Sequence, residues 1–421
     1  MDKAPENLSI GAINPYALTE TLLGRKIDWK APESAKIISE VLGTDYNQLF
    51  DMKFNSPLYT GLKLNGRNAA EPARPVPLPV GDTGARVVTP ELSPRVIKTG
   101  VKTARPAVLN PVLNQPVAKI TPVKSVLNQS IFEYTFNINI LNALGWTPAN
   151  CTWRDMGDFY KDVTEFSDPV QGAVGNCYFI AALAAVAWAD PNVIVHRNRA
   201  TGTGETDRVS GIQFYSKAGG KDAATKLVEV RDHVIVNSSS NQYVYCRSND
   251  NAELWPALYE KAFAKWITGS ASDMPDITQT AYGDPAKATA QINGKTPYYF
   301  NTNTRSGDDL YQIVRAHSMS YKTIHPMTAW TYGSGNYAGS NIVANHAYTI
   351  LGWAYKNGKS YVVLRNPWGQ TEPSGLNTYQ GMLSFFDKSF WRPVTMIGND
   401  GVFALEASAF QQYFACIGVA K

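Results

Sequence analysis

A proline-rich, basic stretch divides this chain and limits where a compact fold can form. Ten prolines, seven Lys or Arg residues and three acidic residues fall between Glu71 and Val123. Such a segment cannot bury enough apolar surface to offset the entropy lost on ordering, so it is not expected to fold alone. The folded part of the protein must therefore lie on one or both sides of it.

Residues 71–125 have two interpretations, a bare linker or a prosegment. A prosegment would lie extended across an active-site cleft, where its repeated Val-Leu-Asn tripeptides would place apolar side chains at regular positions. In that case the N-terminal segment docks in the chain's own cleft and regulates it. Residues 1–70 contain two short stretches with helical periodicity, Tyr16–Leu23 and Ser34–Leu42, which are too small to form a domain.

Residues 126–421 have the composition of a folded enzyme and are predicted to form an α+β core. The first part, about 126–275, contains helical apolar patterns at Phe179–Trp188 and Glu253–Trp266. The second part, about 276–421, consists of aromatic and β-branched strands separated by Gly and Asn turns. A helical lobe followed by a β-rich lobe predicts two lobes with a cleft between them.

Composition excludes several classes of protein. The chain has 421 residues, of which 44% are hydrophobic, so it can bury a large core. Its formal charge is +4, from 39 Lys and Arg against 35 Asp and Glu, which is too slight to predict a nucleic-acid or membrane partner. The sequence has no run of about 18 apolar residues that could span a bilayer, and no signal-peptide pattern at its start.

The four cysteines are far apart and form no CxxC pair, so the sequence predicts neither a zinc site nor a disulfide framework. They are Cys151, Cys177, Cys246 and Cys416. Free thiols favour a reducing, cytoplasmic environment.

One of these cysteines has the setting of a nucleophile. Cys177 follows the glycine-rich loop 171–176 and begins the apolar run that is predicted to be a helix. Unpaired N–H groups and the helix dipole at such a position stabilise a thiolate, which is the attacking species. Gly172 and Gly175 would let the backbone approach a substrate carbonyl, and Gln171 could add a side-chain N–H to the oxyanion. Taken alone, a cysteine on an apolar helix is more often a small core residue.

The matching base is predicted in a β-hairpin. His346 opens a strand that turns at Asn357-Gly358 and returns to Asn366. A two-residue turn would place residue 366 opposite 349, on the other face of the ribbon from His346. A three-residue loop with a G1 bulge at Gly358 would bring both onto one face, so we predict a loop of odd length. The Asn366 oxygen would then accept from one imidazole nitrogen and leave the other for Cys177.

At these residues the sequence resembles the calpain family of papain-like cysteine proteases. QGAVGNCYFIAAL is similar to the family's cysteine segment, NHAYTILG to its histidine strand and LRNPWGQTEPSG to its asparagine block. ELWPALYEKAFAKW is similar to the helix between them, and the chain from Asp400 to Phe414 to the end of the core. The matches occur in family order over residues 165–415.

The resemblance implies a papain-like core of two lobes. It implies Cys177 as nucleophile, His346 as general acid and base, Asn366 as the orienting residue and Gln171 in the oxyanion hole. Trp368 matches the aromatic residue that shields the catalytic hydrogen bond from water.

The sequence departs from the family pattern at Asn176 and Tyr178, where Asp and Trp are usual. It also lacks a dense acidic loop over residues 385–400, so calcium control is not predicted there. The chemistry requires no cofactor. Asp168 matches an acidic position that the family uses for calcium in the first lobe, and the similarly placed Asp232 and Glu253 complete the set of weak calcium candidates.

The predicted function is cysteine endopeptidase activity on protein or peptide substrates through a Cys177 thioester. Two alternatives are a catalytically silent binding module of the same family and a Cys-His acyl transferase. The complete set of three catalytic residues argues against the first. Asn366 argues against the second, because such transferases usually pair histidine with aspartate.

Overall fold

The computed structural model describes the chain on both sides of the proline-rich stretch. The described ranges are 2–5, 8–31, 33–42, 145–194, 196–200, 208–215, 225–250, 252–386 and 391–421. The predictions for residues 71–125 lie outside these ranges. The described residues all belong to one compact unit, so residues before position 43 pack with those after position 144.

Both short N-terminal helices are confirmed. Helix α1 spans Pro15–Leu23, and the Asn14 side chain caps it by accepting hydrogen bonds from the backbone N–H groups of Tyr16 and Ala17. Gly24 ends the helix at φ 65°, a conformation that glycine adopts without strain. Helix α2 spans Ser34–Leu42. The asparagine cap therefore holds residue 14 at a fixed point, directly after an extended segment.

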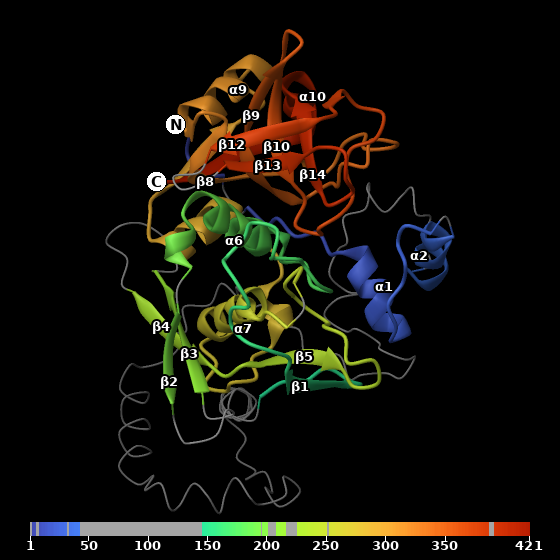
Figure 1. The fold of residues 1–421 in the computed structure, drawn as a ribbon, viewed down its shortest axis with the longest axis vertical. Coiled ribbons are helices and arrows are strands. Elements are labelled where there is room, and N and C mark those ends of the chain that lie inside the picture. The colour runs from blue at the N-terminus through green and yellow to red at the C-terminus, as the bar shows by residue number, and fades with distance from the viewer. Residues whose placement is uncertain are drawn as a thin grey trace, which may run out of the picture. The chain divides into compact units, whose positions relative to one another are not determined.

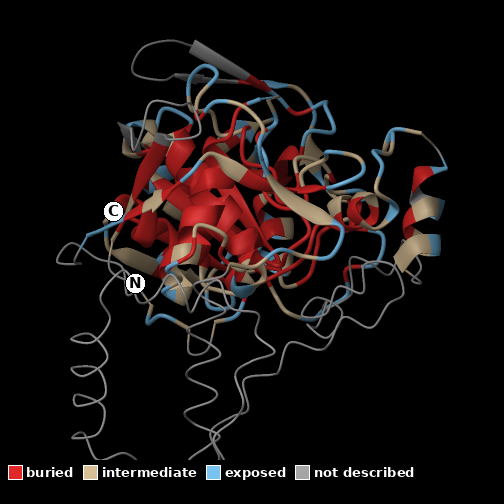
Figure 2. Ribbon diagram, turned by 90° about the horizontal axis from the view of Figure 1, so that it is seen from below, coloured by how far each residue is buried: buried red, intermediate tan, exposed pale blue. Residues whose placement is uncertain are grey.

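The two predicted core helices also form. Helix α6 spans Cys177–Ala189 and is apolar on all sides, as expected of a helix that is surrounded by other elements. Helix α7 spans Trp255–Thr268, and the stacked rings of Phe179 and Phe263, 4.1 Å apart between centroids, join it to α6. Both helices contribute residues to the largest cluster of buried hydrophobic side chains, and Figure 2 shows the buried residues of the chain in red.

The first part of the core contains short strands that the sequence analysis did not predict. β1 pairs with β5, and β2, β3 and β4 form a small antiparallel sheet. Their bounds are β1 Cys151–Asp155, β2 His196–Ala200, β3 Arg208–Phe214, β4 Lys226–Val230 and β5 His233–Asn237. The 3-10 turns η4 and η6 span Pro191–Val193 and Ile277–Thr280. This part is thus mixed rather than purely helical.

The second part is built on a large antiparallel sheet with strand order β11-β14-β10-β9-β8-β15-β6, to which β7 adds beside β8. The bounds are β6 Pro297–Asn301, β7 Ser318–Met319, β8 Lys322–Thr331, β9 Ala347–Lys356, β10 Lys359–Arg365, β11 Thr378–Tyr379, β14 Val402–Glu406 and β15 Phe414–Ala420. Strands β12 Met382–Phe386 and β13 Trp391–Thr395 pair separately. Helices α8 Pro285–Asn293, α9 Gly307–Ala316 and α10 Ala407–Tyr413 were not predicted. Figure 1 shows α9 and α10 beside the sheet and α6 below it.

The hairpin of β9 and β10 corrects one prediction. Tyr355 pairs with Ser360, so the loop has two residues, Asn357 and Gly358, both at positive φ as a type I′ turn requires. The predicted loop of odd length is therefore wrong. The needed one-residue shift arises instead from a β-bulge inside the strand, where Val363 pairs with Gly352 but Leu364 pairs with Ile350.

This bulge sets the face on which the site forms. It leaves Leu351 without a residue opposite it, and beyond it Arg365 pairs with Thr349. Residue 366 then follows opposite 348, two residues from His346 and on the same face.

Within the described ranges, no helix is both long and apolar enough to cross a membrane.

Candidate active site

Cys177 lies at the first position of α6 and is fully buried, with 0% of its surface exposed. The backbone N–H of Ala12 donates to its Sγ atom at 3.3 Å. Burial raises the pKa of the Cys177 thiol to about 11, although the backbone N–H groups of Ala12, Ala347 and Tyr178 oppose this rise. Since Ala347 directly follows His346, the contact with its N–H holds the sulfur beside the histidine strand.

His346 is also fully buried and is oriented by Asn366. Its Nε2 atom lies 2.9 Å from Asn366 Oδ1. The same oxygen accepts from the backbone N–H of Trp368 at 3.1 Å, while Asn366 Nδ2 donates to the Thr371 carbonyl at 3.2 Å. Because Oδ1 must act as an acceptor, Nε2 carries the hydrogen. Nδ1 therefore carries the lone pair, and it has no hydrogen-bond partner among the described residues.

The surroundings of His346 keep it neutral. Burial lowers the pKa of its imidazole to about 3, against the raising effect of the Asn366 hydrogen bond. The Trp368 ring covers it at 4.8 Å between centroids and is itself buried. In this state the thiol and the imidazole are both uncharged.

Gln171 contacts the N-terminal part of the chain. Its Nε2 atom donates to the carbonyls of Ala12 and Val174, at 2.6 Å each, and its Oε1 atom has no partner among the described residues. The predicted oxyanion donor is thus occupied by a carbonyl of the chain itself. Gly172 packs against the backbone of Tyr245, where a β-carbon would come within 2.3 Å, so its role is in internal packing rather than in substrate approach.

Residues 10–14, hereafter the inserted segment, lie directly against Cys177. Ile10 and Gly283 exchange two backbone hydrogen bonds, of 2.9 and 3.0 Å, and the Gly11 N–H donates to the Asn345 carbonyl at 3.2 Å. At the other end, Asn14 Nδ2 donates to the Gln171 carbonyl at 2.8 Å. The sequence analysis gave these residues no role, because contacts of this range leave no local periodicity.

Two further anchors hold the chain on either side of the inserted segment. The Tyr16 hydroxyl lies 2.8 Å from Thr371 Oγ1, next to the Asn366 block. The Asp2 carboxylate pairs with Arg305 at 2.7 Å, and this interaction lowers the pKa of Asp2. The segment is therefore held both before and after the site.

A buried carboxyl that the sequence analysis missed supports the loop before Cys177. Asn176 Nδ2 donates to Glu260 Oε1 at 2.7 Å and to Thr280 Oγ1 at 3.0 Å, and the Cys246 N–H donates to Glu260 Oε2 at 3.0 Å. Burial raises the pKa of Glu260 to about 7. The sequence signal for Glu260 was the presence of an acidic residue within the apolar stripe of α7.

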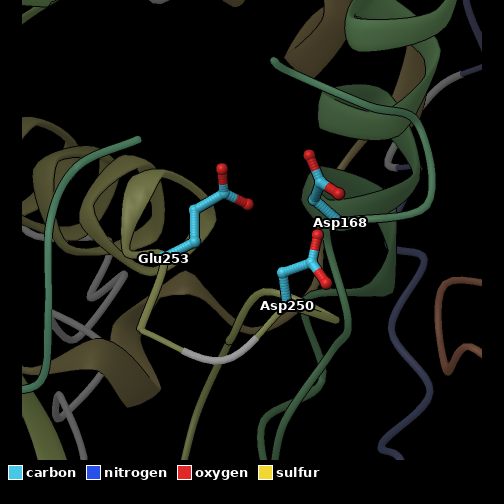
Figure 3. Close-up of side chains that lie close together, drawn as sticks. All are labelled: Asp168, Asp250 and Glu253. Carbon is cyan, nitrogen blue, oxygen red and sulfur yellow. The ribbon is translucent and has the colours of Figure 1, made fainter. Parts of the chain in front are cut away.

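Three carboxylates form a separate cluster near the start of α7. One oxygen from each of Asp168, Asp250 and Glu253 lies within 4.8 Å of the others (Figure 3). Asp168 accepts hydrogen bonds from the Glu165 backbone and from Trp255 Nε1, at 2.7 and 3.1 Å. Burial, reinforced by the charge of Glu253, raises the pKa of Asp168 to about 7.

The structure brings two of the three calcium candidates together and places the third elsewhere. Asp232 accepts a hydrogen bond from Ser210 and lies near Lys261, outside the cluster. Asp250 takes the third position, and the sequence analysis missed it. The sequence signal for Asp250 was its place three residues before Glu253, close to the start of α7.

Comparisons with known proteins identify the family. The family model described as calpain family cysteine protease matches residues 126–421. A thiol protease of Porphyromonas gingivalis (strain ATCC BAA-308 / W83) is 27% identical, over 96% of this chain and 86% of that protein. The human calpain-1 catalytic subunit and human calpain-14 are 26% and 28% identical over 52% and 62% of this chain, which aligns with 29% and 37% of their lengths. The chain belongs to the calpain family of cysteine proteases, whose protease domain has the papain-like fold.

Proposed function

We propose that this protein is a cysteine endopeptidase in which Cys177 is the nucleophile, His346 the general acid and base, and Asn366 the orienting residue. The observation that carries the proposal is the 2.9 Å contact between His346 Nε2 and Asn366 Oδ1. It leaves the Nδ1 lone pair for a proton from the thiol. The large sheet and the part around α6 and α7 are proposed to be the two lobes.

In the proposed reaction Cys177 gives its proton to His346 Nδ1 and its sulfur forms a bond to the substrate carbonyl carbon. The carbonyl electron pair moves to the oxygen, which Gln171 Nε2 and the Cys177 N–H stabilise. As the C–N bond breaks, His346 returns the proton to the leaving amine. Water then attacks the thioester, its proton passes through Nδ1, and the thiol re-forms with release of the acid.

We propose that the N-terminal segment regulates this site. With the inserted segment in place, Ala12 contacts both the nucleophile and Gln171, so a substrate carbonyl has no access to either group. The shifted pKa values of Cys177 and His346 arise mainly from burial. Departure of the inserted segment would admit water, which would lower the pKa of Cys177 and raise that of His346. Both changes favour transfer of the thiol proton to the imidazole, and so favour the thiolate.

We also propose that the cluster of Asp168, Asp250 and Glu253 binds calcium. Calcium is coordinated by six to eight oxygen atoms, and clustered carboxylates supply them. Burial and the neighbouring Glu253 charge raise the pKa of Asp168 and so disfavour its ionised form, and a divalent cation beside these carboxylates would favour that form.

The function is tested with the full chain and its Cys177→Ala variant, incubated with casein and with mixed peptides under reducing conditions. Internal cleavage by the parent chain that is lost in the variant is expected. Equal cleavage by both, or none by the parent after displacement of the inserted segment, would contradict the proposal. Trapping of an acyl-enzyme mass on Cys177 would identify the thioester.

A further inference from the structure

We propose that Tyr282 closes the substrate subsite next to Cys177 against side chains, so that the enzyme selects glycine at the residue that supplies the scissile carbonyl. This inference rests on the proposed peptidase function and deepens it. It assigns a specificity-determining residue and a class of substrate, extended peptides with glycine before the cleaved bond.

The register of the inserted segment indicates which residue occupies this subsite. The atom that contacts the sulfur is the Ala12 nitrogen, and this nitrogen belongs to the peptide bond whose carbonyl is that of Gly11. Gly11 is held by the carbonyl of Asn345, the residue just before the catalytic histidine, and Ile10 pairs with Gly283. The bond between Gly11 and Ala12 is therefore the one presented to Cys177.

This bond is held in an orientation that resists attack. The Ala12 N–H points at the sulfur, and in a trans peptide the Gly11 carbonyl oxygen points to the opposite side. Gln171 donates to the next carbonyl, that of Ala12, instead. In a substrate the same peptide plane must turn so that its carbonyl faces Gln171.

The space around Gly11 admits no side chain. A β-carbon at this position would lie 2.5 Å from Tyr282 Cδ1 and 2.6 Å from the Gly175 carbonyl oxygen. Gly175 itself faces the inserted segment, and the atoms nearest to a β-carbon there would be Ile13 Cγ1 at 3.6 Å and the Gly11 carbonyl group at 3.7 Å. The restriction at Gly11 thus comes from the Tyr282 ring on one side and from backbone on the other.

Tyr282 is fixed in this position by unusual backbone geometry. Its φ is 63°, a left-handed conformation that is uncommon for a bulky residue. Its N–H donates to the Gly175 carbonyl at 2.9 Å, which ties it to the loop before Cys177. The Tyr178 hydroxyl holds the preceding turn through the Thr280 carbonyl at 2.9 Å. Strained residues that their surroundings hold in place often serve function.

The residue before Gly11 shows that side chains are excluded at one subsite and accepted at the next. Ile10 is buried within the main core cluster, at 5% exposure, so the adjacent subsite accepts a branched aliphatic group. The substrate pattern that follows is an aliphatic residue, then glycine, then the cleaved bond.

The test uses a peptide with the sequence of residues 8–14, Leu-Ser-Ile-Gly-Ala-Ile-Asn, and two versions in which the glycine is replaced by Ala or Leu. The enzymes are the full chain carrying Gly11→Val, which displaces its own segment, alone and combined with Tyr282→Gly or Tyr282→Phe. We expect cleavage after glycine, with kcat/KM about 100-fold lower for the leucine peptide. Tyr282→Gly should reduce that ratio by about threefold or more but not abolish it, because the Gly175 carbonyl oxygen still lies 2.6 Å from the β-carbon position. Tyr282→Phe keeps the ring and should preserve the ratio.

Equal cleavage of the three peptides, cleavage after alanine in the parent peptide, or an unchanged ratio in Tyr282→Gly would overturn the inference. Binding of the same peptides to a Gly11→Val, Cys177→Ala chain, measured by fluorescence polarisation, separates it from the peptidase proposal. Tighter binding of the glycine peptide, with no cleavage by any chain that retains Cys177, would support the subsite and refute the peptidase. Equal binding of the three peptides would refute the subsite regardless of catalysis.

Discussion

Two buried, uncharged groups define the site at the scale of single residues. The pKa of Cys177 is raised to about 11 and that of His346 is lowered to about 3, in each case mainly by burial. A thiol and a neutral imidazole react far more slowly than a thiolate beside an imidazolium. The regulation proposed for the N-terminal segment therefore acts by excluding water, and changes in single residues should reverse it.

Gly11→Val should displace the inserted segment, because its β-carbon would lie 2.5 Å from the Tyr282 ring. We expect peptidase activity and alkylation of Cys177 by iodoacetamide at pH 8 to rise about tenfold or more, as the thiol pKa falls on solvation. Peptide mass spectrometry would locate the alkylated cysteine. Ser9→Val places the same side chain at an exposed position two residues away and should change neither rate. Equal effects of both variants would refute the blocking role.

His346 should make stability depend on pH. Its pKa is depressed in the folded chain, so below about pH 6.5 the unfolded chain binds a proton that the folded chain does not. The free energy of unfolding should then fall as the pH drops from 6.5 towards 3, by at most about 1.4 kcal/mol per pH unit from this group. Chemical denaturation at pH 7, 6 and 5 should show a shallower fall for His346→Gln. Parallel curves would mean that the imidazole is already solvated.

At the scale of secondary structure, Asn14 links helix α1 to the site. Its Oδ1 caps the helix and its Nδ2 donates to the Gln171 carbonyl. Substitution separates these two functions, because an aspartate keeps the cap and loses the donor.

Asn14→Asp should activate the enzyme while α1 stays folded, and Asn14→Ala should activate it and also destabilise α1 by about 1 kcal/mol. Peptidase assays and amide hydrogen exchange of residues 15–23 would measure the two effects. If only Asn14→Ala raises activity, the helix cap and not the contact with Gln171 retains the segment.

The β9–β10 hairpin shows how far sequence patterns reach. The sequence located both strands and the Asn357-Gly358 turn, and the requirement that His346 meet Asn366 demanded a register shift of one residue. The shift was assigned to the turn, but it occurs at Leu351. Leu351 packs in a buried cluster with Val363 and Trp188, and such tertiary packing leaves no signal in a local pattern.

Some helices and long-range contacts were also not predicted from the sequence. The helices α1, α2, α6 and α7 were predicted because their apolar periodicity is local. Helix α9 also has local signals, the capping box of Ser306 and Asp309 and the buried face of Leu310 and Val314, and these went unused because the helix lies among strand-like segments. Contacts such as that of Ala12 with Cys177 join residues 165 positions apart. No single-chain pattern encodes a contact of that separation.

At the scale of the whole molecule, the carboxylate cluster should couple metal binding to stability. Millimolar calcium should raise the melting temperature of the parent chain and of Asp232→Asn, which lies outside the cluster. Asp250→Asn should abolish the shift. Because the pKa of Asp168 is raised to about 7, the shift should be larger at pH 8 than at pH 6. A calcium shift that persists in Asp250→Asn but is lost in Asp232→Asn would place the metal elsewhere.

The inserted segment is covalently tethered to the site that it occupies. A tethered ligand competes at an effective concentration on the order of millimolar, however dilute the protein is. A free inhibitor or substrate must outcompete this local concentration, so its apparent affinity for the intact chain is weaker than its intrinsic affinity. Ligands ranked against the intact chain are therefore selected for displacing residues 10–14 as well as for fitting the site.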